Sequence, residues 1–284
     1  MKLANYDDVP WRFIDNPRQG RIEFKELLTG TQGDPNNYGV VIGRVEADFL
    51  SPRHRHNFDQ VRVALEAPTN IGPRLNIDAG DLAYFPEGCY YGPQNQAEVG
   101  QTALTMVVQF GGASGSGYMS MAQMSQGARE LAQSGRFEGG VYRHDDESAK
   151  PRNRDGYEAI WSHVNGKPLV YPPPRYGAPV FIHPAAYAWR ELAGQSGVCE
   201  RRLASFTESG IDLAMLALPE GATWRAPAQD RPVLLFALDG QGRTAAGDGW
   251  ARWSAMEVAP GEDVALSATA HSTWFRLALP RLSG

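Results

Sequence analysis

The sequence contains two similar strand-like stretches, one in each half of the chain. Gln60-Val-Arg-Val-Ala-Leu-Glu-Ala67 aligns without a gap on Val233-Leu-Leu-Phe-Ala-Leu-Asp-Gly240, and Ala79-Gly-Asp81 and Pro260-Gly-Glu262 fall near the same register downstream. The individual residues match weakly, but their order and spacing agree. An internal duplication of a β domain is the simplest explanation, and it predicts a chain built from two related halves.

Alternation of apolar and polar residues dominates both halves. It predicts strands at 39–50, 60–65, 81–85 and 102–110, and again at 211–218, 232–238 and 274–279. The 31 glycines and 20 prolines exceed the usual share of turn-forming residues. Short strands separated by turns, with no helices between them, are typical of a sandwich or barrel, so the predicted fold class is mainly β.

The middle of the chain has a different pattern. Gly111-Gly-Ala-Ser-Gly-Ser-Gly117 ends the first strand block, and Ser120 followed by Gln123 reads as a capping box that opens a helix. Pro172-Pro-Pro174 predicts a stiff, extended arm. We therefore predict a first β domain over 1–115, a linker with one helix and a Pro-rich arm over 116–178, and a second β domain over 179–284.

Composition excludes several classes of protein. A formal net charge of −5 argues against a protein that binds nucleic acid or an anionic membrane surface, because both need a basic face. The longest apolar runs fall short of the roughly 20 residues of a membrane span. The segment from Met1 to Asn16 lacks a signal-peptide core, so we expect a cytoplasmic protein. The two cysteines, Cys89 and Cys199, cannot form a disulfide framework.

The segment from Ser51 to Gln60 is the most informative for chemistry. His54 and His56 stand two positions apart, so on an extended segment both imidazoles point to one face. Gln60 has the same parity and can join them. Two neutral imidazoles supply two nitrogen donors for a divalent metal, with further ligands from other parts of the wall. The alternative is that both histidines are ordinary residues of a ligand cavity.

A second stretch follows further along the chain. Gly80 is followed by a strand and then by Pro86 and Gly88, with an aromatic cluster behind this turn that ends at Tyr91. Together the two stretches resemble the two motifs of the cupin family. The first motif reads His-x-His, then three or four residues, then Glu. The second reads Gly, then five residues, then Pro-x-Gly, then two residues, then His. With the repeat, the chain resembles a bicupin, which implies two double-stranded β-helix (jelly-roll) barrels.

The resemblance assigns metal-binding positions one by one. His54 and His56 occupy the positions of the family's first two metal ligands, while Gln60 stands at its Glu position and Tyr91 at its last His position. Gln is a weaker ligand than a carboxylate. Tyr binds only after losing a phenolic proton with an ordinary pKa of about 10, so the ion must be a strong Lewis acid. Tyr91 is therefore expected to be either a ligand or a proton donor.

The second half lacks these residues. The offset that relates Gln60 to Val233 also places Pro227 and Gln229 at the positions of the two histidines. Pro227, Gln229 and Val233 together cannot hold a transition metal. His271 lies near the second-motif position but is alone. We expect a degenerate barrel with a structural role. Gly240-Gln-Gly242 fits a hairpin turn rather than a dinucleotide-binding loop, because no helix follows.

The resemblance implies a metal-dependent dioxygenase or oxidoreductase that acts on a small oxygenated or aromatic substrate. Iron is the expected ion, although manganese, nickel, copper and zinc also accept imidazole. Arg62 shares the parity of Gln60 and would neutralise negative charge; alternatively it lies at the barrel mouth or pairs with Glu87. The residues expected to line the cavity are Phe58, Tyr84, Tyr90, Gln94 and Met106.

Two other functions are compatible with the same residues. One is an isomerase, lyase or cyclase that uses the metal as a Lewis acid without redox chemistry. The other is a non-catalytic small-molecule-binding protein, which the replacement of strong ligands by Gln60 and Tyr91 favours. The expected partner is a small molecule, and a homodimer is expected from the pairing of cupin barrels.

Overall fold

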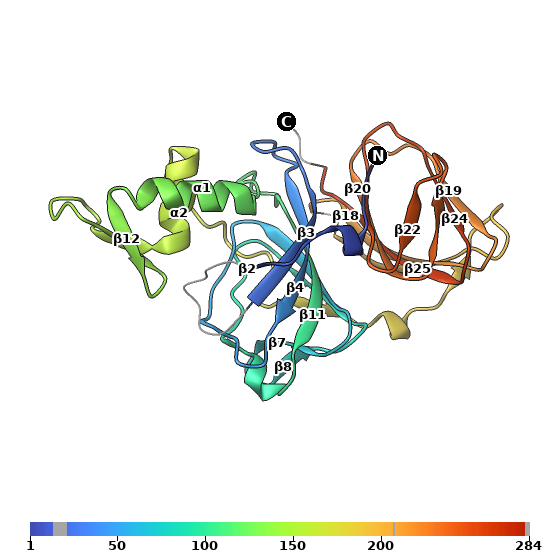
Figure 1. Cartoon of the computed structure of the whole chain (residues 1–284), viewed down its shortest axis with the longest axis horizontal. Coiled ribbons are helices and arrows are strands. Elements are labelled where there is room, and N and C mark those ends of the chain that lie inside the picture. Colours follow the sequence, from blue (N-terminus) through green and yellow to red (C-terminus); the bar gives the residue numbers. More distant parts are fainter. Residues whose placement is uncertain (14–21, 207, 282–284) are drawn as a thin grey trace.

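A computed structural model of the chain describes residues 1–13, 22–206 and 208–281. Within these ranges two seven-stranded antiparallel sheets dominate (Figure 1). The order of the first sheet is β15-β9-β6-β11-β4-β3-β2, and that of the second is β1-β23-β20-β25-β18-β17-β16. The bounds of the first are β15 Val180–Ile182, β9 Leu82–Phe85, β6 Asp59–Ala64, β11 Ala103–Phe110, β4 Tyr38–Val45, β3 Ile22–Thr29 and β2 Arg12–Phe13. Those of the second are β1 Lys2–Ala4, β23 Ala255–Val258, β20 Val233–Asp239, β25 Ser272–Ala278, β18 Ile211–Leu218, β17 Cys199–Phe206 and β16 Arg190–Glu191.

Smaller sheets close each half. In the first half these are β5 Leu50–Ser51 with β10 Gln94–Asn95, and β7 Thr69–Gly72 with β8 Leu75–Ile77. In the second half β19 Thr223–Ala226, β24 Val264–Ala268, β21 Gln241–Thr244 and β22 Gly249–Ala251 form one sheet. The hairpin turn predicted at 240–245 is displaced: residues 241–244 form β21, and the turn that joins β21 to β22 comes after them. The prediction of a mainly β chain with two related halves is confirmed.

Strand register shows the duplication more clearly than the amino acids do. Gln60 on β6 lies opposite Phe85, and Val233 on β20 lies opposite Val258, so one offset in the numbering relates both members of the two pairs. The bulge between β3 and β4 at Leu27 also recurs between β17 and β18, at position 203. Backbone pairing therefore preserves the repeat where side chains have diverged.

The two halves exchange their first strands. β1 at the start of the chain pairs with β23 of the second half, and β15, the first strand of the second half, pairs with β9 of the first. Each half then continues through a short 3₁₀ turn into an edge strand, β2 or β16, that pairs within its own half. Each sheet is therefore completed by a strand from the other half.

The outer faces of the two sheets form a shared apolar core. Val61, Leu82 and Met106 of the first sheet belong to the same buried cluster as Leu213 and Phe236 of the second. Because side chains alternate along a strand, Gln60 and Arg62 point to the other face, into the first barrel. That interior has a smaller apolar cluster: Ala64, Ile71, Ile77, Ala83, Phe85 and Tyr91.

The middle segment extends away from the barrels at the left of Figure 1. Helix α1 (Met121–Leu131) begins at the predicted capping box, in which Ser120 and Gln123 exchange side-chain bonds to backbone N–H groups. The prediction of a single helix was wrong. A second helix, α2 (Gly156–Asn165), starts where Asp155 accepts a hydrogen bond from the Glu158 N–H. Three short strands lie between the helices: β12 Gly135–Glu138, β13 Val141–His144 and β14 Asn153–Asp155.

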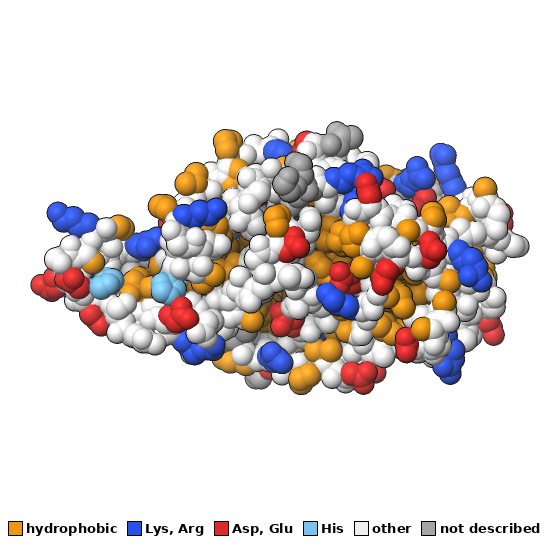
Figure 2. Space-filling view, turned by 90° about the horizontal axis from the view of Figure 1, so that it is seen from above, with side chains coloured by type: hydrophobic (Ala, Val, Ile, Leu, Met, Phe, Trp, Pro, Cys, Tyr) orange, Lys and Arg blue, Asp and Glu red, His pale blue; other side chains and the backbone are white. Residues whose placement is uncertain are grey.

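Charged side chains of both signs are mixed over the face shown in Figure 2. Among the described residues there is no helix with the length and apolar character needed to cross a membrane.

A buried ionic cluster anchors the Pro-rich arm. Arg175 Nη2 lies 2.9 Å from Asp59 Oδ1, and its Nη1 lies 2.6 Å from Glu87 Oε1. Both carboxylates are almost fully buried, and Ser114 donates two further hydrogen bonds to Glu87. Glu208 of the second half lies 3.6 Å from Arg175 Nε. The cluster therefore ties the arm to both barrels.

Replacing Arg175 tests this anchor. Arg175→Met leaves two buried carboxylates without a cation, so we expect the free energy of unfolding to fall by about 3–5 kcal/mol. Urea unfolding followed by circular dichroism measures it. Arg152→Met, which removes an exposed pair with Glu147, should change stability by less than about 1 kcal/mol. Equal effects of the two variants would show that Arg175 is not an anchor.

The same cluster predicts a pH dependence. Burial raises the pKa of Asp59 to about 6, although the Arg175 guanidinium opposes this rise. The folded state therefore holds a proton on Asp59 at pH values where the unfolded state has released it. This proton binding stabilises the protein at acidic pH, and the stabilisation is lost as pH rises through about 6. Relative to Asp59→Asn, wild type should lose up to about 3 kcal/mol of unfolding free energy between about pH 4 and 7. Parallel pH profiles for the two proteins would contradict this assignment.

Candidate metal centre

The His54–His56 segment is held against the turn that carries Tyr91. His54 and Tyr91 form a β-bridge in which each N–H donates to the other's carbonyl at 3.0 Å. Gly88 N–H donates to the His56 carbonyl at 2.7 Å. Gly88 has a φ of 76°, and a Cβ there would meet the carbonyl oxygen of Pro172. The Pro-x-Gly turn therefore aligns the histidines with Tyr91 and lets the arm pass close by.

Three nitrogen atoms meet at one oxygen. Nε2 of His54, Nε2 of His56 and Nη2 of Arg62 each lie 2.8 Å from the phenolic oxygen of Tyr91. The Tyr91 side chain is buried, whereas both imidazoles are partly exposed. The structure therefore brings together four of the residues singled out from the sequence, with Tyr91 at their centre.

The backbone defines the tautomer of one imidazole. His54 Nδ1 lies 2.7 Å from the Pro52 carbonyl oxygen, which can only accept a hydrogen bond. Nδ1 of His54 must therefore carry a proton. In the neutral ring its Nε2 then presents a lone pair toward Tyr91 Oη. This pattern, in which one ring nitrogen is bonded to a carbonyl while the other is directed inward, is usual for metal-binding histidines.

Aromatic rings enclose the cluster. The ring of Phe58 lies 4.5 Å from that of His56 between centroids, and Phe85 lies 4.7 Å from Tyr91. The Arg62 guanidinium lies 5.0 Å from the centre of the Phe85 ring. These contacts restrict the side chains and leave a polar cluster above an apolar barrel interior.

Gln60 is connected to the imidazoles only through Arg62 and Tyr91. Its side chain is fully buried, and its amide contacts Gln109 at 2.8 Å. When the amide oxygen of Gln60 is turned to Arg62, it accepts a hydrogen bond from Arg62 Nε at 2.7 Å. Nη2 of the same guanidinium donates to Tyr91 Oη. Gln60 therefore orients Arg62 rather than joining the two histidines. The alternative pairing of Arg62 with Glu87 is wrong, because Glu87 pairs with Arg175.

The expected cavity-lining residues separate into different environments. Phe58 contacts His56, as described above, but Tyr84 and Met106 are fully buried in the core between the sheets. The prediction that these two residues line the cavity was wrong, because Tyr84 lies opposite Val61 and Met106 opposite Val63, on the sheet face that meets the second sheet. Tyr90 is 42% exposed, and Gln94 donates to the Asn70 carbonyl at 2.9 Å.

The middle segment contributes residues that the motifs did not indicate. Tyr157 on α2 donates to Asn57 Oδ1 at 2.7 Å, next to His56. Arg55 lies 4.8 Å from the ring centre of Tyr90 and 4.1 Å from that of Tyr171 on the arm. The position of Arg55 between the two histidines was a signal in the sequence that it lies near them. Its contact with Tyr171 had no such signal, because Tyr171 is far away along the chain.

The second barrel has no comparable cluster among its described residues. Pro227, Gln229 and Val233 line an apolar cavity of about 20 Å³, which has room for about one water molecule. The barrel interior is filled by three buried tryptophans: Trp224, Trp250 and Trp274. His271, expected near the second-motif position, is exposed in the turn before β25.

Within the part of the chain that the structure describes, no three His, Cys, Asp or Glu side chains come together as a metal site. A metal centre in the first barrel therefore depends on the phenol of Tyr91 as its third donor.

Comparison of sequences identifies no relative: no protein-family model matches, and no curated protein matches. Comparison of structures does. Oxalate decarboxylase from Bacillus subtilis superposes with a TM-score of 0.58 and 12% identity, over 100% of this chain and 77% of its own. The chain folds as a bicupin. The match spans the whole chain, so both barrels are part of this likeness in fold.

Two further solved structures are similar. HEPD from Streptomyces albus, with its substrate 2-hydroxyethylphosphonate and Fe(II) bound, has a TM-score of 0.61 and 11% identity, over 98% of this chain and 76% of its own. Protein Ylba from E. coli has a TM-score of 0.58 and 9% identity, over 99% and 92% respectively. At this level of identity the likeness concerns the fold alone.

Removing the central oxygen tests the cluster as a structural unit. Tyr91→Phe deprives Arg62 and both imidazoles of their shared partner, so we expect a loss of about 1–3 kcal/mol in unfolding free energy. Tyr90→Phe changes the neighbouring exposed phenol and should have an effect within about 0.5 kcal/mol. Urea unfolding of both variants gives the comparison. A Tyr91→Phe protein as stable as Tyr90→Phe would mean that the three contacts contribute little.

Proposed function

We propose that the first barrel binds one divalent metal ion through His54, His56 and Tyr91, and that it oxidises or cleaves a small oxyanion-bearing substrate. The observation that supports this most directly is the meeting of both Nε2 atoms at the phenolic oxygen of Tyr91. Iron is the proposed ion, because HEPD shares the fold and has Fe(II) bound.

The donor geometry fits such an ion. Nitrogen and oxygen ligands at about 2.0–2.1 Å from a metal, set about 90° apart, lie about 3 Å from one another. The two separations of 2.8 Å between the imidazole nitrogens and Tyr91 Oη are close to this value. The hydrogen bond from His54 Nδ1 to Pro52 holds the ring in the orientation that a ligand requires.

A bound divalent ion would supply Lewis acidity and, if redox-active, a place where substrate and dioxygen react. The protein's own groups have separate roles. Arg62 directs Nη2 at Tyr91 Oη and balances negative charge that gathers there. Gln60 and the Phe85 ring hold that guanidinium in place. Phe58 covers one side of His56 and limits the access of water.

Arg62 also supports the class of substrate. A guanidinium with a planar edge toward the barrel interior suits a carboxylate or phosphonate, which it can bind through two parallel hydrogen bonds. Two structures that share this fold are consistent with that choice, since one is an oxalate decarboxylase and the other has 2-hydroxyethylphosphonate bound. We therefore propose a small organic acid.

A second candidate is a binding protein that works without a metal. The Tyr91 hydroxyl has one donor and two acceptor positions, and its three neighbours match these numbers when the phenol donates to His54. The Tyr91 hydroxyl is thus fully hydrogen-bonded as it stands. In this case the same residues would hold the oxyanion of a ligand directly.

Metal stoichiometry separates the two candidates. Protein purified without chelator, and protein reconstituted anaerobically with Fe(II), Mn(II), Ni(II), Cu(II) or Zn(II), should contain close to one ion per chain by elemental analysis. His54→Ala/His56→Ala should lose the ion, because only one donor would remain. His144→Ala/His163→Ala, which changes two histidines of the middle segment, is the matched control and should retain it.

Oxygen consumption with a panel of small organic acids tests the redox part. Wild type should consume oxygen with at least one acid, and Arg62→Met should raise KM more than it lowers kcat, because it removes an anion contact. Metal far below one ion per chain after every reconstitution would exclude the metal proposal and leave the binding protein.

A further inference from the structure

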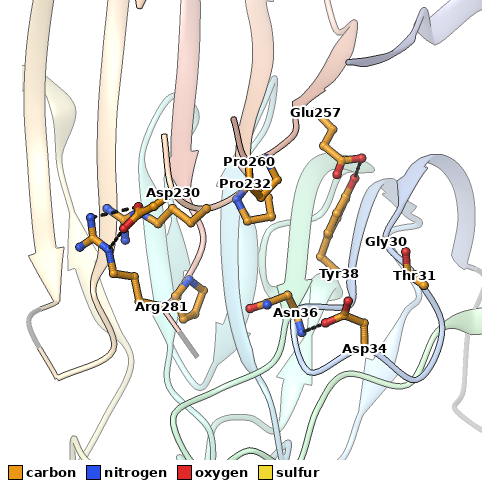
Figure 3. Close-up of a pocket in the computed structure, with 12 residues that line it drawn as sticks. Gly30, Thr31, Asp34, Asn36, Tyr38, Asp230, Pro232, Glu257, Pro260 and Arg281 are labelled. Carbon is orange, nitrogen blue, oxygen red and sulfur yellow. Dashed lines mark hydrogen bonds and ion pairs between the residues drawn. The ribbon is translucent and has the colours of Figure 1, made fainter. Parts of the chain in front are cut away.

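A cavity of about 380 Å³ lies between the two barrels (Figure 3), and neither His54 nor His56 is among the residues that line it. Its volume falls in the range of small-molecule sites. The first half contributes the turn between β3 and β4 and the start of β4. The second half contributes the segments around β20, β23 and β25. The lining residues that matter here are Thr31, Asn36, Tyr38, Arg231, Glu257 and Arg281.

Arg231 is a buried cation in this wall. Its side chain is 8% exposed, and Nη1 donates to the carbonyl oxygens of Gly210 and Leu279, the second at 3.0 Å. Nε is buried and has no hydrogen-bond partner among the described residues. One side of the guanidinium is thus fixed by the backbone, and the unpartnered Nε–H lies on the edge that can bind an oxyanion through two hydrogen bonds.

The neighbouring charges are already paired. Asp230 pairs with Arg281 at 2.9 Å, and Asp212 pairs with Arg276 at 3.7 Å. No ion pair with Arg231 occurs within the described ranges. A buried charge without a counter-charge is costly, so this arginine has a reason to bind an anion.

The carboxylate in the remaining wall is already paired, so the wall does not favour a cation. Tyr38 donates to Glu257 at 2.6 Å, and Lys2 pairs with the same carboxylate, so Glu257 is neutralised. Asn36, from the first half, has a buried Oδ1 that accepts no hydrogen bond from the described residues. Figure 3 shows Asn36 and Tyr38 on a different wall from Asp230 and Arg281. A ligand that offers a donor group to Asn36 would use this atom.

We propose that this inter-barrel cavity is a second ligand site, which binds a small hydroxy or amino acid with its carboxylate on Arg231 and its hydroxyl or ammonium group toward Asn36. The site joins both halves of the chain and does not depend on the metal proposal. A ligand here contacts the segment next to β4 and the segment before β20 at once, so it stabilises the packing of the two barrels.

Thermal unfolding with added ligand tests this site. The probes are L-malate and L-glutamate, with malamide as the uncharged match and sodium chloride at equal ionic strength as the salt control. At least one of the two acids should raise Tm saturably and malamide should not. In Arg231→Lys, which keeps the charge but loses the planar edge, the acid should bind about tenfold more weakly or worse.

A blocking variant keeps the test decisive if Arg231→Lys folds poorly. Thr31 is exposed and lines the cavity, so Thr31→Trp should fold and should abolish the rise in Tm caused by the acid. Gln32→Trp is the control: Gln32 lies on the same turn but does not line the cavity, so this variant should retain the rise in Tm. No saturable shift in wild type with either acid, or an equal shift in Thr31→Trp, would overturn the proposal.

The metal site is distinguished by a further variant. His54→Ala/His56→Ala should show the same shift as wild type if the acid binds between the barrels. A shift lost in this variant but retained in Thr31→Trp would place the acid in the first barrel and overturn the second site. The metal proposal would be unaffected by a negative result here, because it rests on elemental analysis.

Discussion

The packing of one β-sheet face against another determines which side chains of β6 point into the first barrel. On β6, Val61 and Val63 are committed to the core shared by the two barrels. The strand period of two residues then leaves Gln60 and Arg62 for the barrel interior. The polar cluster on Tyr91 exists because the apolar half of the same strand is held by the second barrel. In this sense the second half determines how the polar cluster of the first half is oriented, although His54, His56, Arg62 and Tyr91 all come from the first half.

The sequence predicted the features that depend on local pattern. The strand blocks, the repeat, the capping box at Ser120 and the common face of His54, His56 and Arg62 follow from spacing and parity, whereas the place of Tyr91 beside them follows from the resemblance to the cupin motifs. It failed where the answer depends on which face of a strand meets a partner. Tyr84 and Met106 look like cavity residues until the second sheet is present to bury them. The roles of Arg175, Tyr157 and Tyr171 depend on contacts with distant parts of the chain, and their local sequence has no signal for these contacts.

The two barrels show different outcomes of one ancestral arrangement. The pairing of Gln60 with Phe85 recurs as that of Val233 with Val258, so the backbone register is preserved. The interior of the second barrel, by contrast, contains the three tryptophans described above and no polar cluster among its described residues. Large rings fill the volume that a ligand would need, and burying them adds to the stability of that half. Divergence has therefore acted on the interior face of the sheet, and the outer face remains apolar in both halves.

The exchange of β1 and β15 has a consequence for how this chain can be divided. Each strand begins one half in sequence but completes the other half in space. If the backbone were cut in the middle segment, the two fragments would each carry an edge strand that belongs to the other. Neither would be a whole folding unit, yet together they would contain every pairing of the intact protein. The chain thus has the interlocked form of a swapped dimer joined into a single polypeptide, and its two fragments should reassociate by complementation.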